Sequence, residues 1–527
     1  MRTFMRMPVA VTCAILLGGI VYLGGTGQLG GTVEPPRLPE RSPVDAAACA
    51  RLASLHLPNA TVTSAQAVPG GKFAPPAGVD GSFADLPAFC RVAMTLTPSR
   101  DSDIKAETWL PLSGWNGKLQ EVGNGGWGGS IQYGELADAL RGGYVAASTD
   151  TGHVGGSASF ALGHPEKLID FDYRAVHETA LQSKATIAAL YGAAPQLSYF
   201  TGCSGGGRQG FMEAQRFPQD FEGIVAGAPG YDRTDQSFQL VLVAQATLND
   251  PASKIPPEKY AVLHQAALDA CDARDGVKDG LISDPTRCKF DPAVTQCKGA
   301  DGANCLTPAQ VTAAKKIYAP VIDPQTKQEI FPGFEPGSEL RWGGTSGGPR
   351  PLAVADELFK YVVFKDPNWD FRTLNLRHDL ALARKIDNGD LSPRSANLKP
   401  FVERGGKLLI YHGWGDQNVA PRSSTGYYER LVDTLGKSQV DSSVRLYMVP
   451  GMGHCGGGEG PNVFDTVTPL AQWREHGTAP KEIIASQVTN GAVSRTRPLC
   501  PYPEVGQYKG TGSVDQAENF VCRLPKS

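Results

Sequence analysis

The sequence predicts an α/β fold in which a mainly parallel sheet is interrupted by a large inserted domain. From Lys118 onward, short runs rich in β-branched and aromatic residues alternate with helical stretches, the pattern typical of parallel strands joined by crossover helices. The alternation stops near residue 233 and resumes near residue 396. We therefore expect one sheet built from two separate parts of the chain.

The expected elements follow one another closely on either side of the interruption. A helix is expected from about Asp172 to Tyr191, and another follows Ser204 as far as Phe217. The short β-rich runs predict strands at 119–122, 144–148, 197–200, 223–228, 407–411 and 444–449.

A chain of 527 residues is long enough for a large catalytic core and a second domain. We predict that residues 45–232 and 396–527 form the two parts of the catalytic domain. The stretch 233–395 is rich in Asp-Gly turns, cysteines, prolines and aromatic residues without regular β-α alternation. We predict that it forms a lid.

The N-terminal 31 residues have the pattern of an export signal. Arg2 and Arg6 precede an apolar run, and small residues follow through Gly31. No Ala-x-Ala cleavage site is present, so a retained membrane anchor is the alternative to a cleaved signal peptide. Residues 32–44 form a proline-rich linker. The expected location is the periplasm or the exterior.

The charge balance excludes a nucleic-acid-binding function. The chain has 50 basic and 53 acidic side chains, and no basic cluster is visible along it. The expected partner is a small molecule, with membrane contact only if the N-terminal segment is retained. The oligomeric state is left open.

Ten cysteines follow the signal, and an even number in an exported chain favours five disulfides. No Cys-x-x-Cys pair or histidine at zinc-ligand spacing accompanies them. Local spacing suggests the pairs 271 with 288, 297 with 305, and 500 with 522. The ten residues are Cys49, Cys90, Cys203, Cys271, Cys288, Cys297, Cys305, Cys455, Cys500 and Cys522.

The segment Gly202-Cys-Ser-Gly-Gly206 has the Gly-x-Ser-x-Gly pattern of the nucleophile elbow of α/β-hydrolases. A β-rich run precedes it and a helical stretch follows it, as the elbow requires. Ser204 is therefore the predicted nucleophile. The alternative is a glycine-rich turn that binds a phosphate group.

A nucleophilic serine needs a histidine base and an acid that orients it, in the chain order Ser, Asp or Glu, His. Asp416 and His454 each follow an expected strand directly and satisfy this order. Asp441 precedes its strand and is the weaker acid. Two other histidines have different expected roles: His412 shapes the acid loop and His476 lies at a helix end.

Cysteine placement gives an independent check on this triad. Cys203 adjoins Ser204 and Cys455 adjoins His454. If the triad is right, the two backbones lie close enough for a disulfide that would clamp the nucleophile loop to the base loop.

The oxyanion hole needs two backbone donors. The amide of Gly205, directly after the nucleophile, is the first. The second is expected from the loop Val122-Gly-Asn-Gly-Gly-Trp-Gly-Gly129, with Gly125 or Gly126 as the donor. A plain flexible loop is the alternative.

With these motifs, residues 45–525 resemble the tannase and feruloyl esterase family. The resemblance is carried by Gly202-Cys-Ser-Gly-Gly-Gly-Arg-Gln209, Gly-Asn-Gly-Gly-Trp, Gly-Trp-Gly-Asp416 and Gly-Met-Gly-His454-Cys455. It implies a disulfide between Cys203 and Cys455 beneath the triad, in agreement with the pairing above. It also implies a fifth bond between Cys49 and Cys90.

The insertion contains Cys271-Asp-Ala-Arg-Asp-Gly-Val-Lys-Asp-Gly-Leu-Ile282, with three carboxylates at close spacing. Such hard oxygen ligands suit Ca²⁺, although the spacing is not that of an EF-hand and a solvated Asp-Gly turn is the alternative. The family resemblance implies a structural calcium in the lid. Its implied ligands are the side chains of Asp272, Asp275 and Asp279 and the carbonyls of Val277 and Leu281.

The predicted function is a secreted serine esterase, feruloyl esterase-like, acting on esters of aromatic acids. A tannase, a terephthalate half-ester hydrolase, a serine peptidase and a non-catalytic binding protein on the same scaffold are the alternatives. Substrate-contacting residues are not assigned. Candidates for the acyl-pocket wall are Trp342, Phe359, Phe364 and Trp369, and candidates for gripping a free carboxylate are Arg341, Arg372 and Arg377.

Overall fold

A ten-stranded mixed sheet organises the part of the chain that the computed structural model describes, residues 44–525. The strand order is β1-β2-β3-β4-β6-β5-β7-β8-β11-β12. Its strands are β1 (His56–Leu57), β2 (Ala60–Val68), β3 (Phe89–Leu96), β4 (Ile104–Pro111), β5 (Lys118–Val122), β6 (Val145–Thr149), β7 (Leu197–Cys203), β8 (Gly223–Gly227), β11 (Lys407–Gly413) and β12 (Val444–Val449).

The sheet has a parallel half and an antiparallel half. The six strands from β6 to β12 pair in parallel, which confirms the expected α/β fold, and each overlaps one of the six predicted runs. Strands β1 to β4 pair antiparallel and join the parallel half through β6. The sequence analysis did not place these four. β4 is buried along nearly its whole length, so it lacks the alternation that would indicate a strand.

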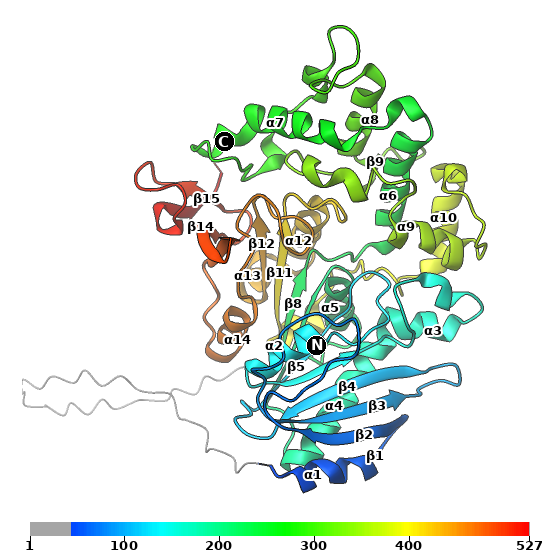
Figure 1. Cartoon of the computed structure of the whole chain (residues 1–527), viewed down its shortest axis with the longest axis vertical. Coiled ribbons are helices and arrows are strands. Elements are labelled where there is room, and N and C mark those ends of the chain that lie inside the picture. Colours follow the sequence, from blue (N-terminus) through cyan, green and yellow to red (C-terminus); the bar gives the residue numbers. More distant parts are fainter. Residues whose placement is uncertain (1–43, 526–527) are drawn as a thin grey trace, which may run out of the picture. The chain divides into compact units, whose positions relative to one another are not determined.

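Helices cover both faces of the sheet (Figure 1). Tyr199 and Phe200 are neighbours on β7 and belong to different cores, as strand geometry requires. One face carries α1 (Ala46–Arg51), α4 (Ala175–Tyr191), α5 (Gly205–Arg216), α12 (Arg422–Leu435) and α13 (Lys437–Ser443). The other face carries α2 (Tyr133–Arg141) and α14 (Val467–His476).

The helix predicted from Asp172 belongs to a helical stretch that begins earlier, at Pro165. Residues Asp170–Arg174 form a π-helical turn, preceded by α3 (Pro165–Ile169), and α4 continues from Ala175. α4 ends at Gly192, whose φ of 71° is the left-handed conformation that glycine adopts most easily at a helix end.

Between β8 and β11 the chain contributes no strand to the large sheet within the described residues. It forms helices and one small antiparallel pair, drawn above the parallel strands in Figure 1. A separate core gathers most of these helices and also includes Trp127 and Phe171 from outside the segment. The elements are α6 (Arg233–Leu248), α7 (Tyr260–Cys271), α8 (Pro308–Tyr318), β9 (Val321–Ile322), β10 (Glu329–Phe331), α9 (Ala353–Glu357), α10 (Leu376–Asp387) and α11 (Lys399–Glu403).

The C-terminal residues form two hairpins outside the large sheet. β13 (Ile483–Thr489) pairs with β14 (Ala492–Leu499), and β15 (Val505–Tyr508) pairs with β16 (Phe520–Arg523). No helix among residues 44–525 is long and apolar enough to cross a membrane. The predicted export signal at 1–31 lies outside the described residues, as does the linker at 32–44 apart from Val44.

Five disulfides are present, and each joins a predicted pair. The three pairs suggested by local spacing are all formed. Cys49 bonds Cys90 across 41 residues, which ties α1 to the antiparallel half of the sheet. Cys203 bonds Cys455 across 252 residues.

Candidate active site

A cavity of about 750 Å³ opens where β5, β7, β8 and β11 end. Ser204 and His454 both line it, together with the loop that contains Gly125 and Gly126. In open α/β sheets, ligands bind outside the carboxyl ends of the strands, so the cavity lies where this fold class places its sites.

Ser204 lies in a strained turn between β7 and α5. Its φ of 61° and ψ of −114° are unfavourable for a residue with a side chain, and its carbonyl accepts the first helical hydrogen bond from the Arg208 amide (3.0 Å). Gly202 and Gly206 make the turn possible, because a Cβ on Gly202 would lie 2.7 Å from the Gly206 backbone. The strand–turn–helix geometry that a nucleophile elbow requires is therefore present at Ser204.

Asp416 is fully buried and accepts a hydrogen bond from His454 Nδ1 at 2.7 Å. Its other oxygen accepts the amides of Asn418 (2.7 Å) and Val419 (2.9 Å). Burial acts to raise the pKa of Asp416, but the charge of His454 and the hydrogen bonds from His412 and His454 outweigh it and lower the pKa. Asp416 thus stays ionised and can fix the His454 tautomer.

The interaction between Asp416 and His454 raises the pKa of His454, whereas it lowers that of Asp416. Burial favours the neutral ring, whereas the charge of Asp416 and its hydrogen bond raise the pKa above the ordinary value. With Nδ1 held by Asp416, Nε2 is the ring atom left for proton transfer in the cavity.

His412 supports the acid, as the sequence analysis expected. Its Nε2 lies 3.0 Å from Asp416 Oδ2 and 3.1 Å from the Val419 carbonyl, both acceptors. Nε2 therefore carries the proton, and Nδ1 accepts from the Ser424 hydroxyl at 2.8 Å. The ring is fully buried and does not line the cavity.

The Cys203–Cys455 disulfide brings the nucleophile loop and the base loop together. The two Cα atoms are 5.9 Å apart, and each cysteine is adjacent in the sequence to Ser204 or to His454. Among residues 44–525 no hydrogen bond joins the Ser204 hydroxyl to His454 Nε2. Such catalytic hydrogen bonds often form fully only when substrate is bound.

The predicted oxyanion donors lie side by side. Gly205 is the first residue of α5, and a Cβ on it would lie only 3.2 Å from the Gly126 amide nitrogen. Gly126 has a φ of +59°, which a residue with a side chain would adopt only under strain. Gly125 and Gly126 both line the cavity.

Asn124 and Gln209 hold this loop against α5, a pairing that the sequence analysis missed. The Asn124 amide donates to Gln209 Oε1 (2.9 Å), and Gln209 Nε2 donates to Asn124 Oδ1 (3.2 Å). Asn124 Nδ2 also donates to the carbonyls of Ser130 and Thr149. Asn124 belongs to the Gly-Asn-Gly-Gly-Trp motif and Gln209 to the motif around Ser204. Their contact was missed because the two residues are 85 positions apart in the sequence.

The weaker candidate acid and the second downstream histidine lie away from the cavity. Asp441 is on α13 and pairs with Lys437 at the surface. His476 is exposed at the end of α14, where Gly477 follows as the left-handed cap. Neither lines the cavity.

The structure corrects the expected cavity wall. Trp342 and Phe359 are fully buried in the core of the inserted segment, and neither they nor Phe364 and Trp369 line the cavity, because large aromatic side chains are chiefly core residues. The inserted segment contributes smaller apolar groups instead, at positions 352–354.

The three carboxylate-gripping candidates are also absent from the cavity wall. Arg341 pairs with Glu459 at 2.9 Å, Arg372 pairs with exposed Asp370, and Arg377 is exposed. The arginine that does line the cavity is Arg233, the first residue of α6. Sequence reasoning missed it because nothing in its neighbourhood resembles a motif.

The loop predicted to bind calcium lies directly after α7 and is closed by the Cys271–Cys288 disulfide. Protein donors occupy its carboxylates. Asp272 accepts the amides of Asp279 and Gly280, Asp275 accepts the Ser283 hydroxyl (2.6 Å), and Asp279 pairs with Arg497. No group of three acidic, histidine or cysteine side chains is gathered for a metal ion within residues 44–525.

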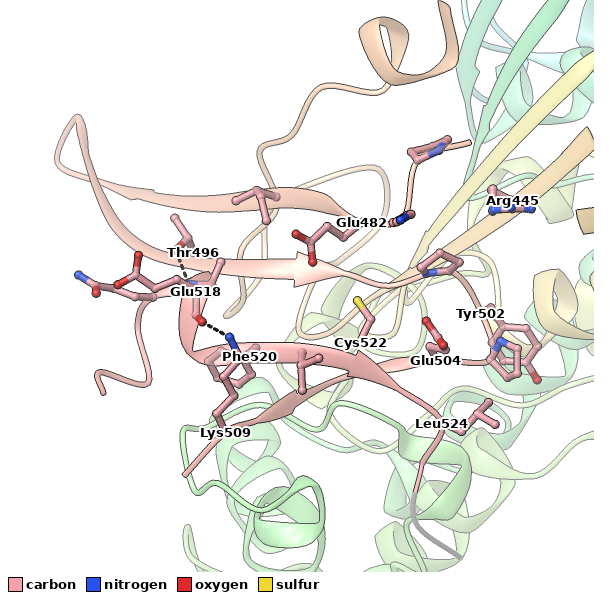
Figure 2. A pocket seen from close by; sticks show the side chains of 18 of the residues that line it. Arg445, Glu482, Thr496, Tyr502, Glu504, Lys509, Glu518, Phe520, Cys522 and Leu524 are labelled. Carbon is pink, nitrogen blue, oxygen red and sulfur yellow. Dashed lines mark hydrogen bonds between the residues drawn. The ribbon is translucent and has the colours of Figure 1, made fainter. Parts of the chain in front are cut away.

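A second, larger hollow lies along the C-terminal hairpins and shares no lining residue with the catalytic cavity. Figure 2 shows Lys509 and Thr496 on its wall, each bonded to the turn before β16. It contains neither a serine beside a histidine nor a glycine-rich loop. We assign no chemistry to it.

The model of the tannase and feruloyl esterase family matches residues 90–523. The chain belongs to this family. An uncharacterized esterase of Xanthomonas campestris pv. campestris is 38% identical over 90% of this chain and 91% of that protein. Feruloyl esterase B from Aspergillus oryzae shares the fold with a TM-score of 0.86 at 31% identity, over 91% of this chain and 100% of that one.

A more distant structural neighbour shares the fold. Tannin acyl hydrolase from Aspergillus niger superposes with a TM-score of 0.74 at 21% identity, over 91% of this chain and 95% of that one. This last match shows the fold alone. The family model and the named esterases show that the chain is a carboxylic ester hydrolase of the feruloyl esterase-like kind.

Proposed function

We propose that the chain is a serine esterase that hydrolyses esters of aromatic acids through an acyl-enzyme. The observation that carries the proposal is the 2.7 Å bond between Asp416 and His454, with His454 lining the same cavity as Ser204 and the Gly125-Gly126 loop. Nucleophile, base, acid and oxyanion donors are all needed for acyl transfer, and they meet at one place.

In the proposed mechanism, Ser204 Oγ attacks the ester carbonyl while His454 Nε2 takes its proton. The amide of Gly205 and that of Gly125 or Gly126 stabilise the negative charge on the carbonyl oxygen. His454 then protonates the leaving alcohol. In the second half, His454 takes a proton from the water that attacks the acyl-enzyme, and it returns this proton to Ser204 Oγ as the acid is released. Asp416 keeps His454 in the required tautomer throughout.

The proposed acyl group is aromatic, as the name of feruloyl esterase B suggests for that relative. In this chain Trp127 and the apolar residues 352–354 line the cavity, and the Trp127 indole donates to the Val354 carbonyl at 3.2 Å. Flat apolar surfaces favour an aromatic acid over a charged sugar.

The test is a hydrolysis panel on the full chain: methyl ferulate, methyl gallate, a terephthalate half-ester, methyl butyrate and a matched anilide. We expect the aromatic esters to exceed methyl butyrate and the anilide to be cleaved far more slowly. Preference for the anilide would indicate a peptidase, and no turnover at all would indicate a binding protein.

The nucleophile is tested separately by labelling with a fluorophosphonate. Wild type is expected to be labelled and Ser204→Ala is not, whereas Ser159→Ala, on an exposed turn, is expected to keep the label. Labelling that persists in Ser204→Ala would overturn the assignment.

Export from the cytoplasm is part of the proposal. Five disulfides favour an oxidising compartment, because cytosolic thiols are kept reduced. Expression of the full chain followed by fractionation and N-terminal sequencing tests it. A mature chain beginning near residue 32 would indicate a cleaved signal, an intact membrane-bound chain would indicate an anchor, and cytosolic protein would contradict export.

We also propose that the loop after α7 binds a structural Ca²⁺ through Asp272, Asp275 and Asp279 and the carbonyls of Val277 and Leu281. Its supply of hard oxygen donors suits this ion. Burial raises the pKa of Asp275 to about 6, and the charges of Asp279 and Asp272 add to the rise against hydrogen bonds from Ser283 and Val277. A bound cation would remove this repulsion, in competition with Arg497 at Asp279.

Metal analysis of the purified chain, with and without a chelator, tests the calcium site. We expect one calcium per chain and a lower Tm after chelation, since a ligand that binds only the folded state stabilises it. Asp275→Asn is expected to lose the metal, and Asp250→Asn, which alters an exposed cap elsewhere in the lid, is expected to keep it. Absence of calcium from wild type with a Tm unaffected by chelation would contradict the proposal.

A further inference from the structure

Arg233 connects the inserted segment to the oxyanion loop, residues 123–129. It is the first residue of α6, is 3% exposed and lines the catalytic cavity together with Ser204. Its Nη2 donates to the Gly126 carbonyl at 2.8 Å, and its Cζ lies 4.3 Å from the centre of the Trp127 ring. A side chain from the inserted segment therefore holds the loop that carries the second expected oxyanion donor.

The Gly126 carbonyl belongs to the central peptide of a tight turn. The Gly128 amide donates to the Gly125 carbonyl at 2.7 Å, and Gly126, the second residue of this turn, has a φ of +59°. The two turn classes with a positive φ at that position differ mainly in the orientation of the central peptide, here Gly126–Trp127. A donor bonded to the Gly126 carbonyl fixes that orientation.

The next two carbonyls of the loop are held by the catalytic domain instead. His153 Nε2 donates to the Trp127 carbonyl at 2.6 Å, and the Thr151 hydroxyl donates to the Gly128 carbonyl at 2.8 Å. Within the described residues the Gly126 carbonyl accepts no hydrogen bond besides that from Arg233. Removal of the arginine would therefore leave the central peptide of the turn unheld.

Within residues 44–525, Arg233 is a buried cation without an ion-pair partner. Its Nε has no hydrogen-bond acceptor there, and Asp172 and Glu357 attract it only at longer range. Burial, followed by the charge of Arg208, lowers the pKa of Arg233 to about 9, so it is still a cation at neutral pH. A buried charge without a counterion destabilises the folded state, so stability alone does not account for Arg233.

The carboxylates beside Arg233 in the sequence are bound by other arginines. Asp232 accepts a hydrogen bond from Arg394 Nε at 2.8 Å, and Asp235 accepts one from Arg384 Nε at 2.9 Å. Both arginines come from the other end of the inserted segment. These pairs anchor the start of α6 and leave the Arg233 guanidinium available to the oxyanion loop.

We propose that Arg233 is a positioning residue for the oxyanion hole, and that its hydrogen bond to Gly126 keeps the loop in the orientation that stabilises the transition state. The inference rests on the proposed esterase function and assigns part of the catalytic geometry to the inserted segment. Oxyanion donors act where charge develops. Loss of Arg233 should therefore weaken binding of the tetrahedral state and leave binding of the flat ester nearly unchanged.

Steady-state kinetics on the best ester of the hydrolysis panel measure this difference. Arg233→Met keeps a long side chain without donors, and its kcat is expected to fall roughly 10- to 100-fold, less than after loss of a whole oxyanion donor. KM is expected to change less than about threefold, because the lost interaction acts only in the transition state. Arg233→Lys keeps a cation and a donor and is expected to recover part of kcat.

Arg372→Met is the matched control. It removes an exposed arginine from the same inserted segment and is expected to keep wild-type kinetics. Thermal unfolding separates catalysis from folding: the Tm of Arg233→Met is expected to equal or exceed that of wild type, since a buried charge is removed. A lower Tm, with a kcat that Arg233→Lys does not recover, would mean that Arg233 only supports the fold and would overturn the proposal.

Two ketones separate the proposal from the esterase mechanism. 2,2,2-Trifluoroacetophenone adds reversibly to a catalytic serine and forms a tetrahedral oxyanion, whereas acetophenone binds without addition. We expect wild type to bind the trifluoroketone at least roughly 100-fold more tightly than acetophenone. Ser204→Ala should lose this advantage entirely, and Arg233→Met should lose about tenfold of it or more while binding acetophenone as wild type does.

The two failures are distinguishable in this inhibition assay. A wild-type enzyme without preference for the trifluoroketone would contradict the serine mechanism, and the positioning role with it. A full preference in Arg233→Met, or an equal loss of affinity for both ketones, would overturn the positioning role and leave the serine mechanism standing.

Discussion

Asp416, which follows β11, and Glu121, which lies on β5, are both fully buried carboxylates, yet their surroundings favour opposite charge states. Asp416 accepts hydrogen bonds from His454, His412 and two backbone amides. Glu121 stands on β5, two residues before the oxyanion loop begins at Gly123, and within the described residues neither of its oxygens has a hydrogen-bond partner.

The consequence appears in the two pKa values. Burial raises the pKa of Glu121 well above its ordinary value, and the charge of Asp220 adds to this against the weaker effect of Lys184. The pKa of Asp416 is lowered despite the same burial. The number of hydrogen-bond donors around a buried carboxylate, and not its degree of burial, therefore decides whether it is ionised and can orient a histidine.

The largest expected effect comes from removing the charge of Asp416. Asp416→Asn keeps the shape but favours the wrong His454 tautomer, and kcat is expected to fall roughly 10,000-fold. Steady-state kinetics on a neutral aromatic ester measure the loss. Asp441→Asn is the matched control and is expected to keep its activity. A large loss of activity in Asp441→Asn, together with near-normal activity in Asp416→Asn, would show that Asp441 is the catalytic acid.

A smaller effect is expected from removing one donor to Asp416. His412→Phe deletes the hydrogen bond at Nε2, and kcat is expected to fall roughly 10- to 100-fold, the equivalent of one hydrogen bond to a charged group. With fewer donors Asp416 holds a proton on His454 more tightly, so the acid limb of the pH profile should move to higher pH.

Two comparisons keep that prediction specific. His412→Gln retains a donor and is expected to recover part of the activity. His476→Phe alters an exposed histidine and is expected to behave as wild type. If His412→Phe is slow but has the same pH profile as wild type, His412 contributes only through packing and not through its hydrogen bond to Asp416.

The wild-type pH profile gives a third, more modest measurement. His454 must be neutral to take the Ser204 proton, and the charge of Asp416 raises the pKa of His454 above 6.5. Activity is therefore expected to rise with pH through a midpoint above 6.5. In the residual activity of Asp416→Asn the midpoint should fall. A wild-type midpoint below 6.5 would contradict the strong coupling of the pair.

The smallest effect on activity is expected from Glu121→Gln, which replaces a neutral acid with a neutral amide. Activity is expected to change less than about twofold. The informative readout is stability, measured by denaturant unfolding at a series of pH values.

The sign follows from proton binding. Above pH 4.5 the unfolded chain releases the Glu121 proton while the folded chain keeps it, because the folded pKa is raised. The stabilisation is therefore lost as the pH rises from 4.5 toward the folded pKa. Glu121→Gln should flatten this decline, and an unchanged slope would mean that Glu121 is ionised in the folded protein.

The sequence predicted the parallel half of the sheet and the elbow because both depend on short-range patterns. β-rich runs of five or six residues and a Gly-x-Ser-x-Gly turn are set by neighbours in the chain. Chain order then sufficed to pair Asp416 with His454. The same reasoning gave Cys203 with Cys455 from adjacency alone.

What the sequence could not predict depends on contacts between distant segments. The antiparallel strands β2 to β4 are recognised by pairing with one another, not by a motif. The wall aromatics were misplaced because Trp342 and Phe359 fill the core of the inserted segment. Arg233 was overlooked because its significance comes from Gly126, 107 positions away.

The Cys203–Cys455 bond also affects the synthesis of the protein and its cleavage by proteases. Cys203 is synthesised 252 residues before its partner, so its native bond cannot form until the entire inserted segment has been translated. Once the bond forms, every residue from 204 to 454 lies within a covalent ring. A protease that cuts anywhere inside that ring leaves the nucleophile and the base on one molecule, and only a reductant releases the two pieces.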